Sequence, residues 1–265
     1  MRKGWMKTAN DFGSGNPSIK GVPQHYSTSP RLKRTMNSTT ICAEEETALK
    51  TRFENDGFLR VPALFSLPEV AALKERVARL VSTESVHTGV QVWFPDELDA
   101  LVGEAVLGPR VGELLRPLLG PRPEFLSVKP VYKSARVSFA SPWHQDRAYW
   151  GGSVKLSFWI ALDPCTEENG CLKVIPGSHR QFLEHGKYEL GKFENRIREE
   201  LLADQPVLSV EMQPGDALIF HDLLVHGSHP NRSGRDRWSL IPTYRDGATP
   251  DASKVWKQGG VPLRG

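Results

Sequence analysis

The sequence predicts a mostly β domain with flanking helices, built as a β-sandwich or a barrel. Three features of the 265 residues support this prediction: helical patterns come first, short strands follow, and Gly, Pro, Asn or Asp turns separate the strands. Because helices and strands do not alternate, a repeated β-α-β arrangement is disfavoured. The chain is long enough for a substantial core, and its 39% hydrophobic and 25% charged residues are typical of a globular protein.

The helices are expected in the first half of the chain. Acidic residues followed by apolar residues at helical spacing predict one helix that starts near residue 41 and stops at Asp56, and a strand follows over 58–65. The segment SLPE at 66–69 is a capping box with an early proline, so it opens a second helix that runs to about Val81. Apolar residues recur at helical spacing over 108–119 and predict a third helix.

Short runs rich in branched and aromatic residues follow residue 121 and predict strands. A charged, partly helical insertion at 180–205 interrupts them, and it could cover the mouth of a barrel as a lid. The expected strands are FLSVKPVYK (125–133), VKLSFWIAL (154–162), CLKVIP (171–176), PVLSVEM (206–212), DALIF (216–220) and RWSLIPTYR (237–245).

Charge is concentrated at the N-terminus. Residues 1–35 hold seven basic side chains and one acidic one, a local charge of +6, so the rest of the chain carries −3 of the total of +3. The globular part is therefore mildly acidic, and no basic surface for nucleic acid is expected. Residues 1–40 are rich in Gly, Pro, Ser and Asn without a periodic apolar pattern, which predicts a basic, disordered tail. A role for this tail in organelle targeting is an alternative.

The cysteines and the apolar runs bear on the compartment. The chain has three cysteines and no CxxC pair, so a disulfide framework is not expected. No apolar run approaches the roughly 18 residues that cross a bilayer, and the N-terminus lacks the apolar segment of a secretory signal. We therefore expect a cytoplasmic protein without membrane contacts.

The segment SPWHQDRAYW places His144 and Asp146 two residues apart. On a strand, this spacing directs both side chains to one face, where they could chelate one ion or form an ordinary ion pair. A third ligand could come from GDALIFHDLLVHGSHP, which contains His221, His226 and His229. Two imidazoles and one carboxylate form the facial triad of non-haem Fe(II) oxygenases.

The stretches WHQDRAYWGG, LSFWIALDPCTEENGCLKVIPGSHR and PGDALIFHDLLVHGSHPNRSGRDRW resemble the phytanoyl-CoA dioxygenase family of Fe(II)/2-oxoglutarate oxygenases. The resemblance extends from about Glu44 to Arg245. It implies a double-stranded β-helix core (jelly-roll, cupin-like) within a single oxygenase domain at 41–247, which leaves 248–265 as a C-terminal tail. It also implies Fe(II), with 2-oxoglutarate and O2 as cosubstrates and ascorbate as a supporting reductant. The family's metal ligands match His144, Asp146 and His226.

The same resemblance assigns the cosubstrate site. Arg237, eleven residues after His226, matches the arginine that holds 2-oxoglutarate in the family, and a guanidinium fork suits a carboxylate. Arg232 and Arg235 are rivals that are more typical of solvated surface charges. Further matches to cosubstrate-contacting positions are Ser228, Trp159 and Lys133, and Ser239 could add a hydroxyl beside Arg237.

The implied reaction converts 2-oxoglutarate and O2 to succinate and CO2 while a C–H bond of a small organic molecule is oxidised. Hydroxylation is the default outcome, and desaturation, cyclisation and epimerisation are alternatives. A catalytically silent member that binds a metal, a ligand or a partner protein is the competing interpretation. The oligomeric state is not indicated. Candidate wall residues for the substrate, equally interpretable as ordinary core aromatics, are Trp143, Tyr149, Trp150, Trp93 and Phe94.

Overall fold

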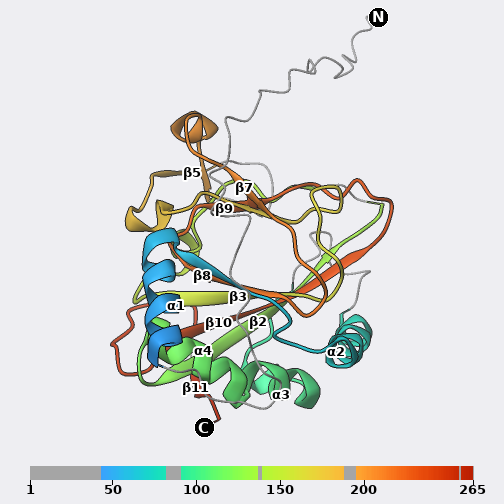
Figure 1. The fold of residues 1–265 in the computed structure, drawn as a ribbon, viewed down its shortest axis with the longest axis vertical. Coiled ribbons are helices and arrows are strands. Elements are labelled where there is room, and N and C mark those ends of the chain that lie inside the picture. Colours follow the sequence, from blue (N-terminus) through green and yellow to red (C-terminus); the bar gives the residue numbers. More distant parts are fainter. Residues whose placement is uncertain (1–42, 82–90, 137–138, 188–194, 257, 265) are drawn as a thin grey trace, which may run out of the picture.

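The computed structural model describes residues 43–81, 91–136, 139–187, 195–256 and 258–264. The expected basic tail at 1–40 lies outside these ranges. Two antiparallel sheets form the centre of the structure, with helices packed on one side (Figure 1). None of the described helices has the length and apolar character needed to cross a membrane.

The larger sheet has six strands in the order β1-β8-β3-β10-β2-β11, and every pairing in it is antiparallel. Neighbours in this sheet are far apart in the sequence, as the crossed connections of a jelly-roll require. Its strands are β1 (Phe58–Val61), β2 (Pro123–Lys133), β3 (Lys155–Ala161), β8 (Ala217–His221), β10 (Arg237–Asp246) and β11 (Val261–Pro262).

The smaller sheet has the order β7-β4-β9, and it faces the larger one across a shared apolar layer. Its strands are β4 (Leu172–Val174), β7 (Leu208–Val210) and β9 (His226–Ser228), and a separate pair is formed by β5 (His185–Lys187) and β6 (Asn195–Ile197). Trp159 and Leu218 of the large sheet pack in one buried cluster with Val174 and Val210 of the small sheet. The double-stranded β-helix expected from the sequence is therefore confirmed.

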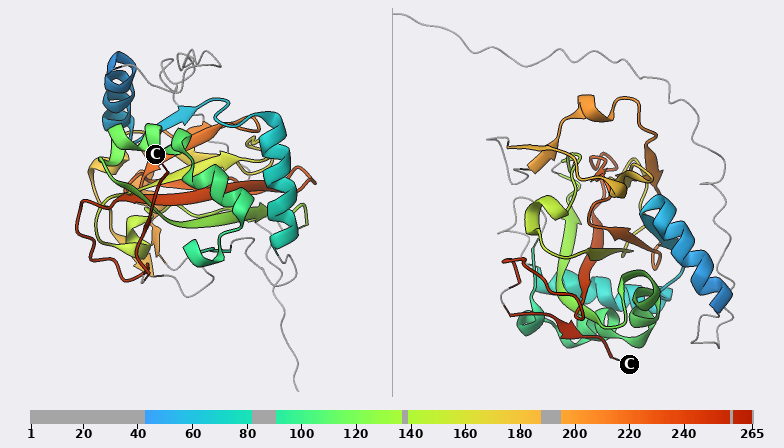
Figure 2. Two further views of the ribbon diagram at one scale, coloured as in Figure 1. Left: turned by 90° about the horizontal axis from the view of Figure 1, so that it is seen from below. Right: turned by 90° about the vertical axis from the view of Figure 1, so that its left-hand side faces the viewer.

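The helices cover the outer face of the large sheet, opposite the small sheet (Figure 2, right). They are α1 (Ala43–Asp56), α2 (Leu67–Leu80), α3 (Ala100–Leu107) and α4 (Pro109–Leu119). A further one-turn helix, α5 (Arg147–Trp150), lies between β2 and β3 in the chain. Because both faces of the central strand β3 are covered, all seven of its residues are buried.

The sequence predicted most of these helices but missed α3. The capping box before α2 is present: the Ser66 amide donates to Glu69 Oε2 at 2.7 Å, and the Glu69 amide donates to Ser66 Oγ at 3.4 Å. Helix α3 is almost entirely apolar and therefore lacks a helical period, although the Asp99 side chain caps it by accepting from the amides of Leu101 and Val102.

Residues 248–265 were expected to be a tail outside the domain, and this prediction is wrong for the described part. Strand β11 pairs with β2, and Trp256 is only 9% exposed, with its ring centroid 5.3 Å from that of Trp150. Asp251 pairs with Lys155 Nζ at 3.1 Å, with both side chains buried. The segment is held by a few separate residues, Asp251 and Trp256 among them, and not by apolar residues at a regular spacing. Its sequence therefore has no periodic pattern that would indicate the contact.

The Asp251–Lys155 pair gives a stability prediction. Burial alone would raise the pKa of Asp251, but hydrogen bonds from the Ser153 amide and from Lys155 lower it to about 2, so Asp251 is a carboxylate at neutral pH. Asp251→Ala leaves the Lys155 cation buried without its counter-charge, and we expect the free energy of unfolding to fall by about 3 kcal/mol. Urea denaturation of this variant measures the loss. Asp204→Ala, which removes an exposed carboxylate, is the control, and equal losses in the two variants would contradict the assignment.

Candidate metal and cosubstrate site

His144 and Asp146 are brought together by a turn, not by a strand. His144 forms an isolated β-bridge with His226 of β9, in which each amide donates to the other residue's carbonyl at 2.9 and 3.0 Å. Asp146 has helical dihedral angles (φ −58°, ψ −31°) and is the N-cap of α5. The expectation that strand alternation aligns the two side chains is therefore wrong, although the two residues do converge. A residue in helical conformation redirects the chain, so the two-residue spacing no longer sets the face.

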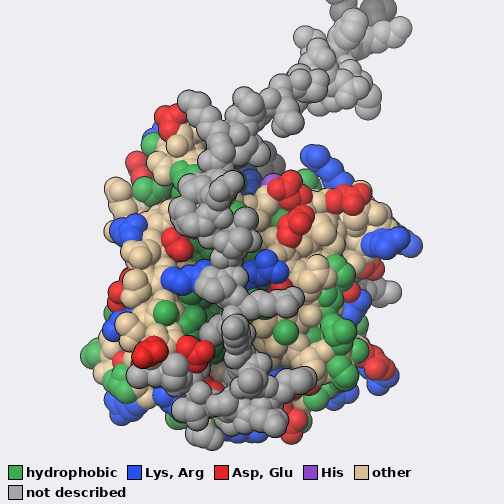
Figure 3. Space-filling model, viewed as in Figure 1, with side chains coloured by type: hydrophobic (Ala, Val, Ile, Leu, Met, Phe, Trp, Pro, Cys, Tyr) green, Lys and Arg blue, Asp and Glu red, His purple; other side chains and the backbone are tan. Residues whose placement is uncertain are grey.

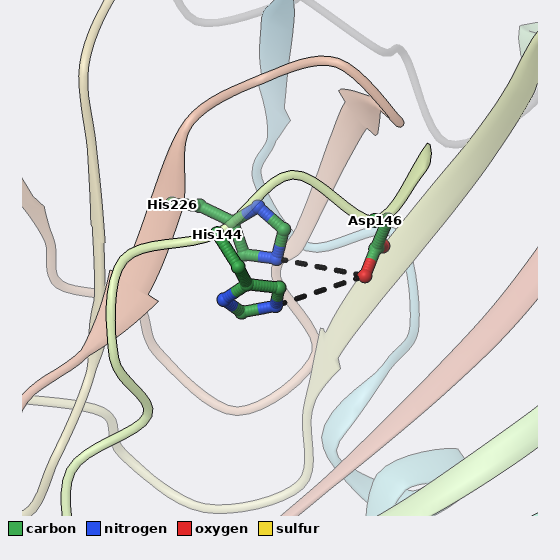
Figure 4. A group of neighbouring side chains, drawn as sticks. All are labelled: His144, Asp146 and His226. Carbon is green, nitrogen blue, oxygen red and sulfur yellow. Dashed lines mark ion pairs between the residues drawn. The ribbon is translucent and has the colours of Figure 1, made fainter. Parts of the chain in front are cut away.

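The three expected ligands meet at one point. Asp146 Oδ1 lies 3.8 Å from His144 Nε2 and 4.0 Å from His226 Nε2. Figure 4 shows both imidazoles directed at this carboxylate. All three side chains are buried, and their ligand atoms lie within 4.8 Å of one another. Within the described part of the chain, no other group of His, Cys, Asp or Glu side chains converges in this way.

The protonation of the site suits a divalent metal. His144 Nδ1 lies 2.8 Å from the Pro142 carbonyl and His226 Nδ1 lies 2.9 Å from the Leu224 carbonyl. Because a carbonyl only accepts, each Nδ1 carries the proton and each Nε2 keeps its lone pair for a metal. Burial, reinforced by His226, lowers the pKa of His144 to about 3, which keeps the ring neutral at physiological pH. Burial would raise the pKa of Asp146, but Lys129 and the two histidines lower it, so Asp146 is ionised.

Gln145, between the two ligands of the HxD motif, holds the turn in place. Its buried side-chain amide donates to the Gln181 carbonyl at 2.7 Å and to the Leu223 carbonyl at 2.6 Å. Its Oε1 accepts from the Leu183 amide at 2.8 Å, and its own amide donates to His185 Nε2 at 3.0 Å. The insertion after residue 180 thus contacts the turn of the candidate metal site directly. The sequence did not indicate this role, because the contacts join residues that are 36 to 78 positions apart.

Substituting Gln145 should therefore affect both stability and metal binding. Gln145→Met retains the volume but leaves two carbonyls and one amide in partly buried positions without partners, which costs about 2–4 kcal/mol of unfolding free energy. We expect a lower melting temperature and a weaker affinity for Fe(II), measured by thermal unfolding and metal titration. Gln181→Ala is the control, because its contribution is a backbone carbonyl that the substitution keeps. An unchanged Gln145→Met protein would contradict this role.

His221 and His229, the alternatives for the distal ligand, lie elsewhere. His221 Nδ1 accepts from the Leu223 amide at 3.0 Å, and its ring faces that of His179 at 5.5 Å. Burial lowers the pKa of His221 to about 4. His229 Nε2 lies 3.0 Å from Ser209 Oγ. Of the three candidates, the structure places His226 alone beside His144 and Asp146.

Arg237 lies at the start of β10, only 1% exposed, on the face between the sheets. Its Nη1 donates to Ser239 Oγ at 3.0 Å and its Nη2 donates to the Gly170 carbonyl at 3.1 Å. Its guanidinium carbon lies 4.9 Å from the centre of the Trp159 ring. The buried Nε has no hydrogen-bond partner, and no described carboxylate forms an ion pair with this cation. A buried guanidinium with an unused donor fits an anionic ligand. Arg235, one of the two rival arginines, is exposed.

Of the remaining expected cosubstrate residues, Lys133 lies beside Arg237 and Ser228 lies on the same strand as His226. Lys133 is the direct register partner of Arg237, and its Nζ donates to the carbonyls of His229 and, at 3.0 Å, Phe139. Burial, together with the Arg237 charge, lowers the pKa of Lys133 to about 7. Gly170 makes room for this lysine, because an added Cβ would lie 2.7 Å from its Cδ. Ser228, two residues from His226, accepts a hydrogen bond from the Ser141 amide at 3.0 Å.

The aromatic residues around the motif divide into two groups. Trp143 is a core residue that packs in a cluster with the insertion, and Trp93 is partly buried against the cluster on the outer face of the large sheet. Tyr149 is 37% exposed, with its ring centroid 5.8 Å from that of His144. Trp150 packs with Trp256, and Phe94 packs against the same cluster. Tyr149 and Trp150, with Phe94 beside Trp150, are therefore the candidates that remain for a substrate wall.

Comparison with known proteins decides the family. The family model of phytanoyl-CoA dioxygenase matches residues 53–239. The chain belongs to the phytanoyl-CoA dioxygenase family. It is accordingly a non-haem iron dioxygenase that depends on 2-oxoglutarate. Among curated relatives of this dioxygenase, an L-proline trans-4-hydroxylase from Streptomyces griseoviridis is 28% identical over 226 residues, covering 74% of this chain and 84% of the relative. An ectoine dioxygenase from Bordetella parapertussis is 29% identical over 227 residues, 72% of each chain.

Solved structures of other proteins share the fold of this dioxygenase. The epimerase SnoN in complex with Fe3+, α-ketoglutarate and nogalamycin RO has a TM-score of 0.67 at 21% identity and covers 84% of this chain and 97% of its own. EctD from S. alaskensis in its apo form has a TM-score of 0.65 at 22% identity, and the match covers 82% of this chain and 81% of EctD.

Acidic and basic side chains are mixed on the face of the dioxygenase seen in Figure 3.

Proposed function

We propose that His144, Asp146 and His226 hold the Fe(II), and that the enzyme hydroxylates an unactivated C–H bond of a small organic molecule. The convergence of these three buried side chains, with both Nδ1 atoms fixed on carbonyls, supports the metal assignment. The unpaired Nε of buried Arg237 supports the 2-oxoglutarate assignment. Hydroxylation is preferred over other oxidative outcomes because two of the curated relatives are a hydroxylase and a dioxygenase of small molecules.

Each residue has a distinct task in this proposal. The iron, with 2-oxoglutarate and O2, supplies the oxidation that releases succinate and CO2. His144 and His226 present neutral Nε2 donors, and Asp146 adds one negative charge. Arg237 binds the far carboxylate of 2-oxoglutarate, with Ser239 orienting the guanidinium through Nη1. The adjacent ring of Trp159 keeps water from this ion pair, which strengthens it.

Lys133 and Ser228 have supporting tasks. Lys133, whose pKa is lowered to about 7, lies beside Arg237 and fixes the 229 and 139 carbonyls. Ser228 holds the segment that leads into His144 against β9. Free, buried Cys165 and Cys171 are consistent with a reducing compartment, and we therefore extend the proposal to a cytoplasmic location.

Turnover of 2-oxoglutarate tests the proposal. Purified protein with Fe(II), 2-oxoglutarate, ascorbate and O2 should form succinate, and the rate should rise with a suitable substrate. The panel includes L-proline and ectoine, and mass spectrometry detects the addition of one oxygen atom. The catalytically silent alternative predicts bound iron without succinate, even when a metabolite extract is added. A product that has lost two hydrogen atoms would indicate desaturation instead of hydroxylation.

A further inference from the structure

Lys129 faces the space between the two sheets. On β2 and β10, side chains alternate between the outer and inner faces, and Lys133 is paired with Arg237 on the inner face. Four residues earlier, Lys129 is paired with Ile241, which packs in the apolar cluster between the sheets. Lys129 therefore lies on the same inner face as the cosubstrate residues, at a distance of about 13 Å along the strand from Lys133.

Lys129 differs from the other inward-facing lysines in its contacts. Lys133 donates to two carbonyls, and Lys155 donates to two carbonyls and to Asp251. Lys129 Nζ forms neither a hydrogen bond nor an ion pair with the residues that the structure describes. It lies over the face of the Trp150 ring, 5.0 Å from the centroid. Lys129 is half-buried.

Lys129 shares its face of the sheet with residues that lead to Asp146. Asp146 Oδ2 lies 3.5 Å from Ser157 Oγ, which lies 3.4 Å from Thr243 Oγ1, and Thr243 is paired with Ser127, one inner-face position from Lys129. The charge of Lys129 also contributes to the lowered pKa of Asp146. Asp146 does not pair with it directly, because no ion pair joins the two. A free cation therefore lies beside the reacting centre and apart from the Arg237–Lys133 pair.

An apolar wall adjoins this cation. Trp150 packs on Trp256 of the C-terminal segment, and Trp256 Nε1 donates to Ser127 Oγ at 3.1 Å, one inner-face position from Lys129. Leu126 and Phe94 complete the cluster. The segment after residue 247 thus forms part of the wall beside the metal ligands.

We propose that Lys129 binds a carboxylate of the primary substrate, with Trp150 bounding the apolar part of that molecule. The inference rests on the proposed function, because it places the substrate beside the metal ligands. A monoanion is favoured over a phosphate, because one ammonium beside the Asp146 carboxylate can balance a single negative charge. An oriented carboxylate would fix which carbon of the substrate faces the metal ligands.

Binding of simple probes tests this assignment without knowledge of the natural substrate. The full chain is loaded with Mn(II) in place of Fe(II) and saturated with 2-oxoglutarate, so that Arg237 is occupied. Paramagnetic relaxation of probe protons reports binding near the metal. The probes are benzoate and cyclohexanecarboxylate, each compared with its uncharged amide. We expect the acids to bind at least about 5-fold more tightly than the amides.

Variants of Lys129 identify the group responsible. Lys129→Met should remove the preference for acids, while Lys129→Arg should keep most of it. Lys254→Met, which removes an exposed lysine of the C-terminal segment, is the matched control and should leave the preference unchanged. Because Lys129 makes no hydrogen bond to described residues, the melting temperature of Lys129→Met should stay near that of the parent protein.

Several results would overturn the inference. Equal binding of acids and amides to the parent protein, or a preference that persists in Lys129→Met, would show that Lys129 does not bind the carboxylate. Weaker binding of 2-oxoglutarate to Lys129→Met would assign the cation to the cosubstrate instead. Failure of the parent protein to bind Mn(II) and 2-oxoglutarate, measured first, would instead contradict the proposed function, and the inference with it.

Discussion

Replacing His226 by alanine is expected to abolish iron binding and succinate formation. The variant loses one of the three donor atoms that converge within 4.8 Å, and the remaining pair offers one imidazole and one carboxylate. Loss of groups that merely support a ligand costs 10–100-fold in metal affinity, so loss of a ligand itself should exceed about 100-fold. Iron bound per chain after desalting, and succinate formed per minute, measure the two effects.

Two other histidines of the same region provide matched controls. His221→Ala and His229→Ala should retain iron and a measurable fraction of turnover, because their rings contact the Leu223 amide and Ser209, away from the converging side chains. Thermal unfolding of all three variants separates loss of iron from loss of the fold. If His221→Ala lost iron while His226→Ala kept it, the distal ligand would be misassigned.

Arg237→Ala should weaken 2-oxoglutarate binding by about 10- to 100-fold, because a charge-assisted hydrogen-bonded pair contributes about 1.5–3 kcal/mol. Iron binding should survive, since none of the three proposed ligands contacts this side chain. Arg237→Lys should recover part of the affinity, because the ammonium keeps the charge but loses the fork that bonds Ser239 and Gly170. Titration of the iron–cosubstrate charge-transfer absorbance measures the affinity.

Arg235→Ala is the matched control for this measurement. Arg235 is exposed and lies two residues before β10, so its removal changes the net charge without touching the inner face. Its affinity for 2-oxoglutarate should stay within about 2-fold of the parent protein. A larger defect in Arg235→Ala than in Arg237→Ala would show that the cosubstrate lies nearer the 231–236 loop.

Features with a local cause could be predicted from the sequence. The capping box at Ser66 and the strands separated by turn residues follow from neighbouring residues alone, and both are confirmed. The HxD motif indicated two residues that the structure brings together, but the geometric reason is wrong, since Asp146 has helical dihedral angles at the N-cap of α5. The spacing between His226 and Arg237 indicated an arginine that is indeed buried on the inner face.

Features that depend on contacts between distant segments could not be predicted. Gln145 is held by residues 181–185 and 223, and Trp256 reaches Ser127 across 129 positions. Neither contact leaves a periodic pattern, because a single buried side chain carries it. The alternation that directs Lys129 inward is visible in the sequence, but the absence of a partner for it among the described residues is a property of the fold.

Anomalous diffraction at the iron edge tests the central assignment most directly. Crystals grown without oxygen in the presence of Fe(II) and 2-oxoglutarate should show one anomalous peak per chain, bounded by Nε2 of His144, Nε2 of His226 and a carboxylate oxygen of Asp146. The far carboxylate of 2-oxoglutarate should then lie against Arg237. A peak beside His221 and His179, or 2-oxoglutarate bound away from Arg237, would contradict the account.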